Sequence, residues 1–170
     1  EDPPEIATLL LDFSKITDAA ETVSQIIANG VLPAALELMD RNVVAAVEPF
    51  AKAGYPLDAE AVLIAEVDGL PDGVSHEVGI ISDIAINNGA REVRIAADEE
   101  ERERIWKGRK SAFGAIAKIK PDYYLHDTVI PRGRLAEVIE KVYKIAETHD
   151  LVVMNVFHAG DGNLHPLLVF

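Results

Sequence analysis

The chain has 170 residues, contains no cysteine and carries a formal net charge of −13, with 29 acidic against 16 basic residues. Disulfides, thiolate metal sites and cysteine nucleophiles are therefore excluded. The acidic balance argues against a nucleic-acid partner, which requires basic patches. No apolar run reaches the roughly 18 residues of a membrane span. Hydrophobic residues make up 49% of the chain, which is enough for the core of one domain.

Strands and helices alternate in the first part of the chain. Hydrophobic spacing predicts strands over 7–13, 31–39, 61–67 and 92–97, and helices over 17–28, 42–53 and 75–87. Thr17 or Asp18 is expected to cap the first helix and Asp40 the second. Pro49 predicts a kink or break in the second helix. Pro33 makes the strand at 31–39 an edge or bulged strand.

The second part begins with a long predicted helix from Asp98 to about residue 118. A connector with some strand follows over 119–131, then an amphipathic helix over 133–149 and a strand over 151–157. Two similar β-α-β halves separated by helices predict an α+β fold. We expect a ferredoxin-like split βαβ sheet with helices packed on one face and extra helical inserts.

Two histidines near the end of the chain flank a tight turn, in the segment His-Ala-Gly-Asp-Gly-Asn-Leu-His-Pro at 158–166. Asp-Gly between apolar runs predicts a β-hairpin. If Asp161 and Gly162 form a two-residue loop, His158 faces His165, with Cβ atoms about 4.5–5.5 Å apart. Imidazoles at that separation can share one metal ion.

Other interpretations of the histidine pair stay open. A loop at 162–163 would move the register, and the two histidines would no longer face each other. Both could also be ordinary polar residues at strand ends. A stable site needs at least a third ligand, usually a carboxylate or another histidine. Beyond the pair the sequence offers only the apolar run 167–170, and together with the missing initial Met this suggests a piece of a longer protein.

Arg109 and Lys110 lie on the long predicted helix, after Trp106. A guanidinium pairs with a carboxylate through two parallel hydrogen bonds, so Arg109 suits a small acid substrate. The alternative is a surface arginine paired with nearby acids such as Glu101 or Glu103 on the same helix. Trp106 fits core packing better than substrate contact.

The histidine segment resembles the signature of the C-terminal domain of FAD-linked 2-hydroxyacid oxidases. Segments at 31–40, 65–69, 105–113 and 127–132 resemble the same family in the same order, the last two as its Trp-x-x-Arg-Lys and Asp-x-x-Val-Pro-Arg motifs. The resemblance is nearest the glycolate oxidase and D-lactate dehydrogenase branch. Some hydroxyglutarate dehydrogenases of the family have Asn at the position of Leu167. The leucine therefore favours the glycolate oxidase and D-lactate dehydrogenase branch.

The resemblance implies that residues 1–170 form one cap, or substrate-binding, domain of a longer oxidase. The FAD-binding domain and the C-terminal end of the parent are then expected outside this sequence, together with a Glu-His-Gly motif. In the family that motif supplies the third metal ligand and the general base, so no catalytic base is expected here. The implied reaction is oxidation of glycolate or a small D-2-hydroxy acid, with hydride transfer to FAD.

The resemblance also assigns roles to particular residues. Arg109 and Lys110 are expected to bind the substrate, and His158 and His165 a divalent metal of the Zn or Mn type. Two further residues, Asp127 and Asn163, are expected near the flavin, although Asp127 could simply cap a turn. The implied setting is cytoplasmic, with peripheral membrane contact only through partner subunits of an oxidase complex.

Two rival functions remain at this point. One is a stand-alone ferredoxin-like domain that binds a small molecule or metal without catalysis. The other is a metal-dependent hydrolase, which requires a third metal ligand within the chain, such as Asp127.

Overall fold

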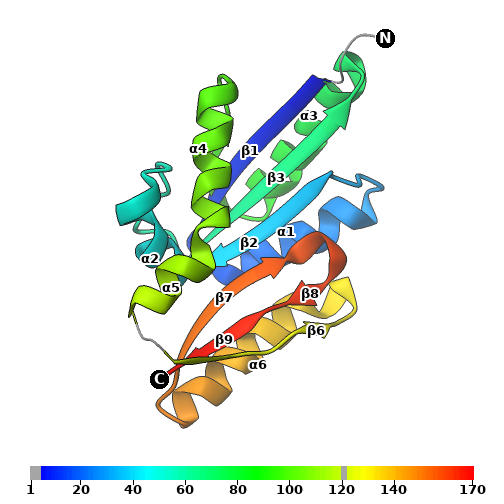
Figure 1. Cartoon of the computed structure of the whole chain (residues 1–170). Coiled ribbons are helices and arrows are strands. Elements are labelled where there is room, and N and C mark those ends of the chain that lie inside the picture. Colours follow the sequence, from blue (N-terminus) through cyan, green and yellow to red (C-terminus); the bar gives the residue numbers. More distant parts are fainter. Residues whose placement is uncertain (1–4, 120–121) are drawn as a thin grey trace.

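The computed structural model describes residues 5–119 and 122–170, which form one sheet with helices on both faces (Figure 1). Part of the connector predicted at 119–131, residues 120 and 121, lies outside the described residues, as do residues 1–4.

The first sheet strands form a split βαβ arrangement. The elements in chain order are β1 (Glu5–Phe13), α1 (Ile16–Ala28), β2 (Ala35–Asp40), β3 (Ala61–Gly69), α3 (Pro71–Asn87) and β4 (Ala90–Ile95). The strand order is β4-β1-β3-β2, and each neighbouring pair is antiparallel. Because β3 lies between β1 and β2, this arrangement confirms the ferredoxin-like fold predicted from the sequence.

The inserted helices α2 (Arg41–Ala51), α4 (Glu99–Lys110) and α5 (Ala112–Ile119) pack on one face of the sheet. The single helix predicted from Asp98 to residue 118 is therefore wrong, because the helix is interrupted at Ser111. The amide of Ser111 still bonds to the carbonyls of Lys107 and Gly108, and its hydroxyl donates to the Lys107 carbonyl at 2.7 Å. A serine that bonds to its own backbone competes with helix continuation.

The C-terminal part adds strands beside β2. Its elements are β5 (Tyr123–Leu125), β6 (Thr128–Val129), η1 (Arg132–Arg134), α6 (Leu135–Thr148), β7 (Val152–His158), η2 (Ala159–Asp161), β8 (Asn163–Leu164) and β9 (Pro166–Val169). Strand β7 pairs antiparallel with β2 on one side and with β8 and β9 on the other. This pairing places the end of the chain's last long strand against the start of β2.

Two hydrophobic cores lie on opposite faces of the sheet. Alternate residues of β1 enter different cores, because successive side chains of a strand point to opposite faces. Leu9 and Leu11 pack under α1, α3 and α6, whereas Leu10 packs with α2, α4 and α5. Coverage of both faces explains why β1 and β3 read as continuous apolar runs instead of alternating ones.

The starts of α1, α2 and β2 test the caps and the strand start predicted from the sequence. Asp40 caps α2 as expected, accepting a hydrogen bond from the Val43 amide at 2.9 Å. The cap expected at Thr17 or Asp18 is wrong, because α1 begins at Ile16. The edge or bulged strand predicted at 31–39 is wrong, because β2 pairs with β3 and β7 without a register shift. The strand begins only at Ala35, beyond the proline at position 33 that cannot donate to the ladder.

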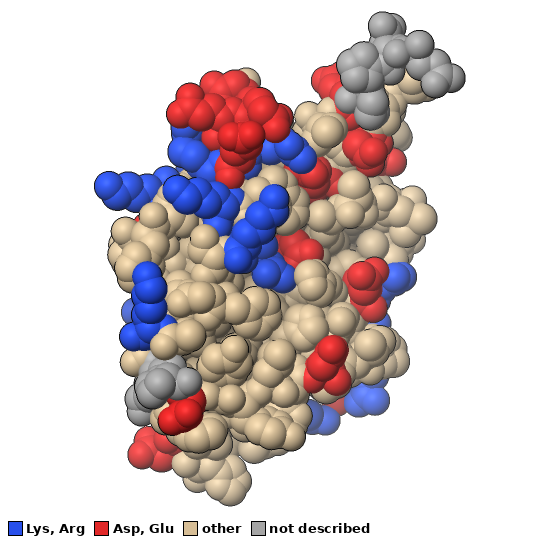
Figure 2. Space-filling view, in the orientation of Figure 1, with Lys and Arg blue, Asp and Glu red and all other residues tan. Residues whose placement is uncertain are grey.

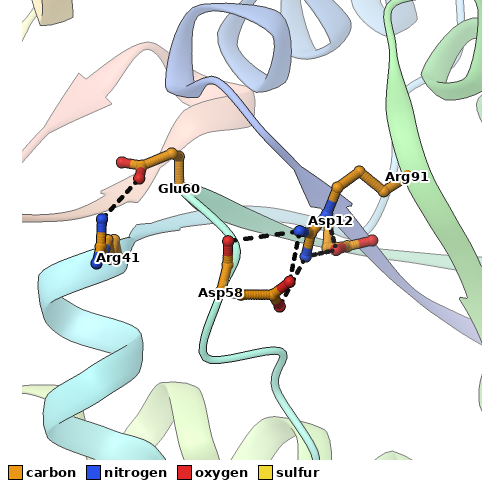
Figure 3. Close-up of polar contacts among 5 residues, drawn as sticks. All are labelled: Asp12, Arg41, Asp58, Glu60 and Arg91. Atoms are coloured by element: carbon orange, nitrogen blue, oxygen red, sulfur yellow. Dashed lines mark hydrogen bonds and ion pairs between the residues drawn. The ribbon is translucent and has the colours of Figure 1, made fainter.

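An ion-pair network fixes the loop before β3 to the edge of the sheet (Figure 3). Arg91 of β4 donates to the buried carboxylate of Asp12 in β1, with a distance of 2.7 Å from Nε. The same guanidinium donates to Asp58 at 2.9 Å from a terminal nitrogen. Nearby, Arg41 and Glu60 pair at 2.9 Å and tie α2 to the start of β3.

Candidate functional site

The histidine hairpin has a longer loop than the sequence predicted. Residues 159–162 connect the strands: η2 turns the chain, and Gly162 follows at a φ of +70°, which glycine adopts without strain. His158 pairs with Asn163, so the predicted Asp161–Gly162 turn, with His158 opposite His165, is wrong. The alternative loop at 162–163 is wrong as well, because Asn163 belongs to β8.

The two imidazoles nevertheless meet. Their ring centroids lie 5.3 Å apart with the rings nearly perpendicular, at 88°. His165 is two residues beyond Asn163, the ladder partner of His158, so the histidines are diagonal neighbours on one face. Diagonal neighbours lie within reach of ring side chains. The proximity that a shared metal would need is therefore present through another register.

A buried carboxylate connects His158 of β7 to Arg109 of α4. Glu37 of β2 faces His158 in the ladder and is only 8% exposed. Its Oε1 lies 2.7 Å from Nδ1 of His158. Its Oε2 accepts hydrogen bonds from Nε and a terminal nitrogen of Arg109 at 3.0 and 2.8 Å. One carboxylate thus contacts both the imidazole and the guanidinium.

Arg109 is a buried residue, 7% exposed, near the C-terminal end of α4. The alternative of a surface arginine paired with Glu101 or Glu103 is therefore wrong. Glu101 instead pairs with Arg94 at 3.2 Å. Helix α4 is strongly polar along its length, with acids in its first turn and bases in its last. Figure 2 shows these as a red tip above a group of blue side chains.

His165 lies beside Asp127 and Asn163. Its Nδ1 is 3.7 Å from a carboxylate oxygen of Asp127, whose side chain is exposed. Burial lowers the pKa of His165, which the nearby Asp127 only partly offsets, so a neutral imidazole is favoured. Within the described residues, His165 Nδ1 and Asn163 Oδ1 are buried without a hydrogen-bond partner. Such orphaned polar atoms mark a place where another molecule's atoms can bind.

Lys110 does not join this cluster. Its exposed side chain lines a different cavity of about 700 Å³, together with Trp106, Lys107 and Glu66. Trp106 is half-buried, packs against the core under α4 and donates from its indole nitrogen to Glu66. A second cavity, of about 430 Å³, is lined by Glu37 and His158 and borders the cluster itself.

Within the described residues, the cluster brings two imidazoles together without a third candidate metal ligand. Across residues 5–119 and 122–170, no group of three His, Cys, Asp or Glu side chains is placed to hold a metal ion. A hydrolase site that is complete within the chain is therefore not supported by the part that the structure describes. No helix among the described residues is long and apolar enough to cross a membrane.

Sequence reasoning missed Glu37. The available signal was a single acid inside the apolar run 35–39, because a charge in a buried strand requires a partner. The partner could not be identified from sequence, since Arg109 and His158 lie 72 and 121 residues away.

The fold is shared with several enzymes of known structure. p-Cresol methylhydroxylase superposes with a TM-score of 0.70 at 13% sequence identity, covering 99% of this chain and 39% of that one. Alkyldihydroxyacetonephosphate synthase gives 0.68 at 12% identity, with 98% and 36% covered. At these identities the likeness shows a common fold for the domain.

Sequence comparison then identifies the family. Residues 2–170 match the family described as FAD linked oxidases, C-terminal domain, and the chain belongs to it. It is 48% identical to glycolate oxidase subunit GlcD of Escherichia coli, covering 99% of this chain and 34% of that protein. GlcD of Bacillus subtilis is 38% identical, with 96% and 35% covered. A probable mitochondrial D-lactate dehydrogenase of Danio rerio is 27% identical, with 98% and 34% covered.

The chain thus spans about a third of the length of the curated relatives it matches.

Proposed function

We propose that residues 1–170 form the substrate-binding cap of a longer flavoprotein that oxidises glycolate or a small D-2-hydroxy acid. The observation that carries this proposal is the position of Arg109 and two imidazoles on one face of the sheet. It is supported by 48% identity to a glycolate oxidase subunit over 99% of the chain. The oxidation removes a hydride from the α-carbon and a proton from the hydroxyl group, leaving a 2-oxo acid.

Arg109 would bind the substrate carboxylate. Its Nε and one terminal nitrogen already donate to Glu37. Among the described residues, the other terminal nitrogen makes no hydrogen bond to the protein. This leaves one edge of the guanidinium for a carboxylate oxygen. Lys110 would contribute only through its positive charge at the neighbouring cavity.

His158 and His165 would hold a divalent metal of the Zn or Mn type. The residues fit such an ion, because ligating histidines ordinarily bond through their other ring nitrogen to a carboxylate, as His158 does with Glu37. The orphaned Nδ1 of His165 fits as well. When bound, the metal would polarise the substrate hydroxyl and lower its pKa. We infer that a third ligand and the base that accepts the hydroxyl proton come from outside residues 1–170.

Asp127 and Asn163 would face the flavin. Both lie at the His165 side of the cluster, where the side chain of Asp127 is exposed and the side-chain Oδ1 of Asn163 has no partner among the described residues. The flavin would accept the hydride, as the family description FAD linked oxidases suggests. The parent protein would work with partner subunits, since two of its relatives are named as subunits of glycolate oxidase. We also propose a cytoplasmic setting for it.

The visible absorption spectrum of the full-length flavoprotein tests this function. It should show bound flavin, and anaerobic addition of glycolate or D-lactate should bleach the flavin band. The acid that bleaches it identifies the substrate, and L-lactate serves as the matched control. A folded, colourless protein would overturn the proposal in favour of a binding domain without chemistry. Residues 1–170 alone should turn over neither acid.

A further inference from the structure

We propose that Glu37 is the positioning residue of this site: it fixes the tautomer of His158 and the orientation of Arg109 through one buried carboxylate. The inference deepens the proposed function and rests on it for the roles of His158 and Arg109. In this role Glu37 acts through His158 and Arg109, which its two carboxylate oxygens contact, and not through direct contact with substrate or metal.

The imidazole contact sets which nitrogen of His158 can bind a ligand. An ionised carboxylate only accepts hydrogen bonds, so His158 must donate to Glu37 Oε1 from Nδ1, at 2.7 Å. In a neutral imidazole the proton is then on Nδ1 and the lone pair is on Nε2. The side chain of His158 is 49% exposed while Glu37 is 10% exposed. The carboxylate therefore lies on the inner side, and the half-exposed ring offers Nε2 to a ligand.

The guanidinium contact is made side-on by two nitrogens that share Oε2. Arg109 is thereby held by one edge, with its charge largely compensated within the protein. Without Glu37, the buried positive charge of Arg109 would need solvent or another anion. Glu37 thus links the expected carboxylate-binding group to the expected metal-binding group, so that the two cannot move independently.

Glu66 provides a matched comparison on the same face of the sheet. It also accepts hydrogen bonds from an arginine, Arg102, at 2.9 and 3.0 Å, and from the indole of Trp106. It contacts no imidazole in the part of the chain that the structure describes. Glu66 therefore carries the structural role of a carboxylate under α4 without the positioning role proposed for Glu37.

The decisive variant is Glu37→Gln in the full-length flavoprotein. Arg109 still needs an acceptor, so the amide oxygen should replace Oε2 and the amide nitrogen should replace Oε1. A donor then faces Nδ1 of His158, which must accept, and the ring proton moves to Nε2. The chemical shifts of ¹⁵N-labelled histidine report this tautomer directly. In the metal-free proteins, where no ion fixes the ring, we expect Nδ1–H in the unmodified protein and Nε2–H in the variant.

Metal affinity provides the second readout. Zn²⁺ or Mn²⁺ titrated against a competing chelator should bind about 10–100-fold more weakly to Glu37→Gln, the usual effect of losing such a carboxylate. Glu66→Gln should leave the His158 tautomer and the metal affinity unchanged, although it removes a comparable ion pair. Equal losses in the two variants would overturn the proposal, because they would show a general effect of destabilisation.

The tautomer of the unmodified protein keeps the proposal testable if Glu37→Gln does not fold. A proton on Nε2 of His158 in that protein would refute it, whatever the variant does. The outcome is also separate from that of the proposed function. A flavin that neither acid bleaches would count against the oxidase assignment, whereas the tautomer measurement would still decide the role of Glu37.

Discussion

Gly108 lies against the ring of Tyr55 so closely that a β-carbon at this position would fall on the ring atoms. Tyr55 is buried, and its hydroxyl donates a hydrogen bond to the Ile105 carbonyl one turn earlier in α4. Arg109 directly follows Gly108 in α4. A glycine inside a helix is ordinarily unfavourable, and here, in the last turn of α4, it allows the helix to approach the core.

We therefore expect Gly108→Ala to destabilise the protein by about 1–3 kcal/mol, the usual cost of overpacking. Gly114→Ala is the matched control, because its β-carbon would enter open space on the exposed side of α5. That substitution should stabilise by up to about 1 kcal/mol through helix propensity. Thermal and denaturant unfolding measure both changes, and a stabilised Gly108→Ala would contradict the packing described.

Removing either imidazole should abolish tight metal binding. His158→Ala and His165→Ala each leave a single ring, so the affinity for Zn²⁺ should fall by more than the roughly 10–100-fold that follows loss of an outer-shell carboxylate. His76→Ala on the exposed side of α3 is the control and should change nothing. Retention of stoichiometric metal by both single variants would exclude the pair as ligands.

Glu37 and Arg109 should show strong energetic coupling. Arg109→Gln leaves a buried carboxylate without its guanidinium, and Glu37→Gln leaves a buried guanidinium opposite a neutral amide. Each should cost about 3–5 kcal/mol in the free energy of unfolding. The double variant removes both charges and should cost clearly less than the sum. Additive losses in this double-mutant cycle would show that the pair is not coupled.

Stability should fall as the pH rises through the titration of Asp40. Burial raises the pKa of Asp40 from 3.8 to about 6, although hydrogen bonds from Tyr143, Val43 and Asn155 oppose the shift. The folded state then favours the neutral acid. Its contribution is fully present below about pH 4 and is lost as the pH approaches and passes 6. By linkage the loss is about 3 kcal/mol.

Denaturant unfolding at pH 4, 5, 6 and 7 checks this. Asp40→Asn should flatten the profile in this interval, because no charge forms at the buried cap. Tyr143→Phe removes a donor that stabilises the charged form, at 2.6 Å from the carboxylate, so the loss should become larger. A profile of Asp40→Asn that still falls between pH 4 and 6 would assign the effect to other groups.

The sequence predicted those features that depend on neighbouring residues. The Asp40 cap, the alternation of strands and helices, and hence the split βαβ sheet all follow from local patterns. The break at Ser111 was missed because neither glycine nor proline marks it. The hairpin register was missed because Gly162 permits a left-handed residue after a short helical turn, which the Asp-Gly signal does not distinguish from a two-residue loop.

The candidate site was predicted in part, for a related reason. His158 and His165 lie close together as expected, although through another register, because one hairpin brings them there. The position of Asp127 beside His165 was not expected under the oxidase interpretation. Glu37 of β2 contacts Arg109 of α4, a helix that packs on the sheet. Pairing of this kind depends on tertiary packing, and one sequence contains no periodic signal for it.

The wide spacing of the site residues along the chain has a consequence for folding. Glu37, Arg109 and His165 come from separate elements, and β2 and β7 meet only when the N-terminal and C-terminal parts of the sheet have joined. Any ligand held by this cluster binds the native state alone, so its binding energy is added to global stability by mass action. Amide hydrogen exchange should therefore slow throughout the central strands on ligand binding, far beyond the residues in contact. In this fold, ligand binding at the site and unfolding of the whole sheet are therefore thermodynamically coupled.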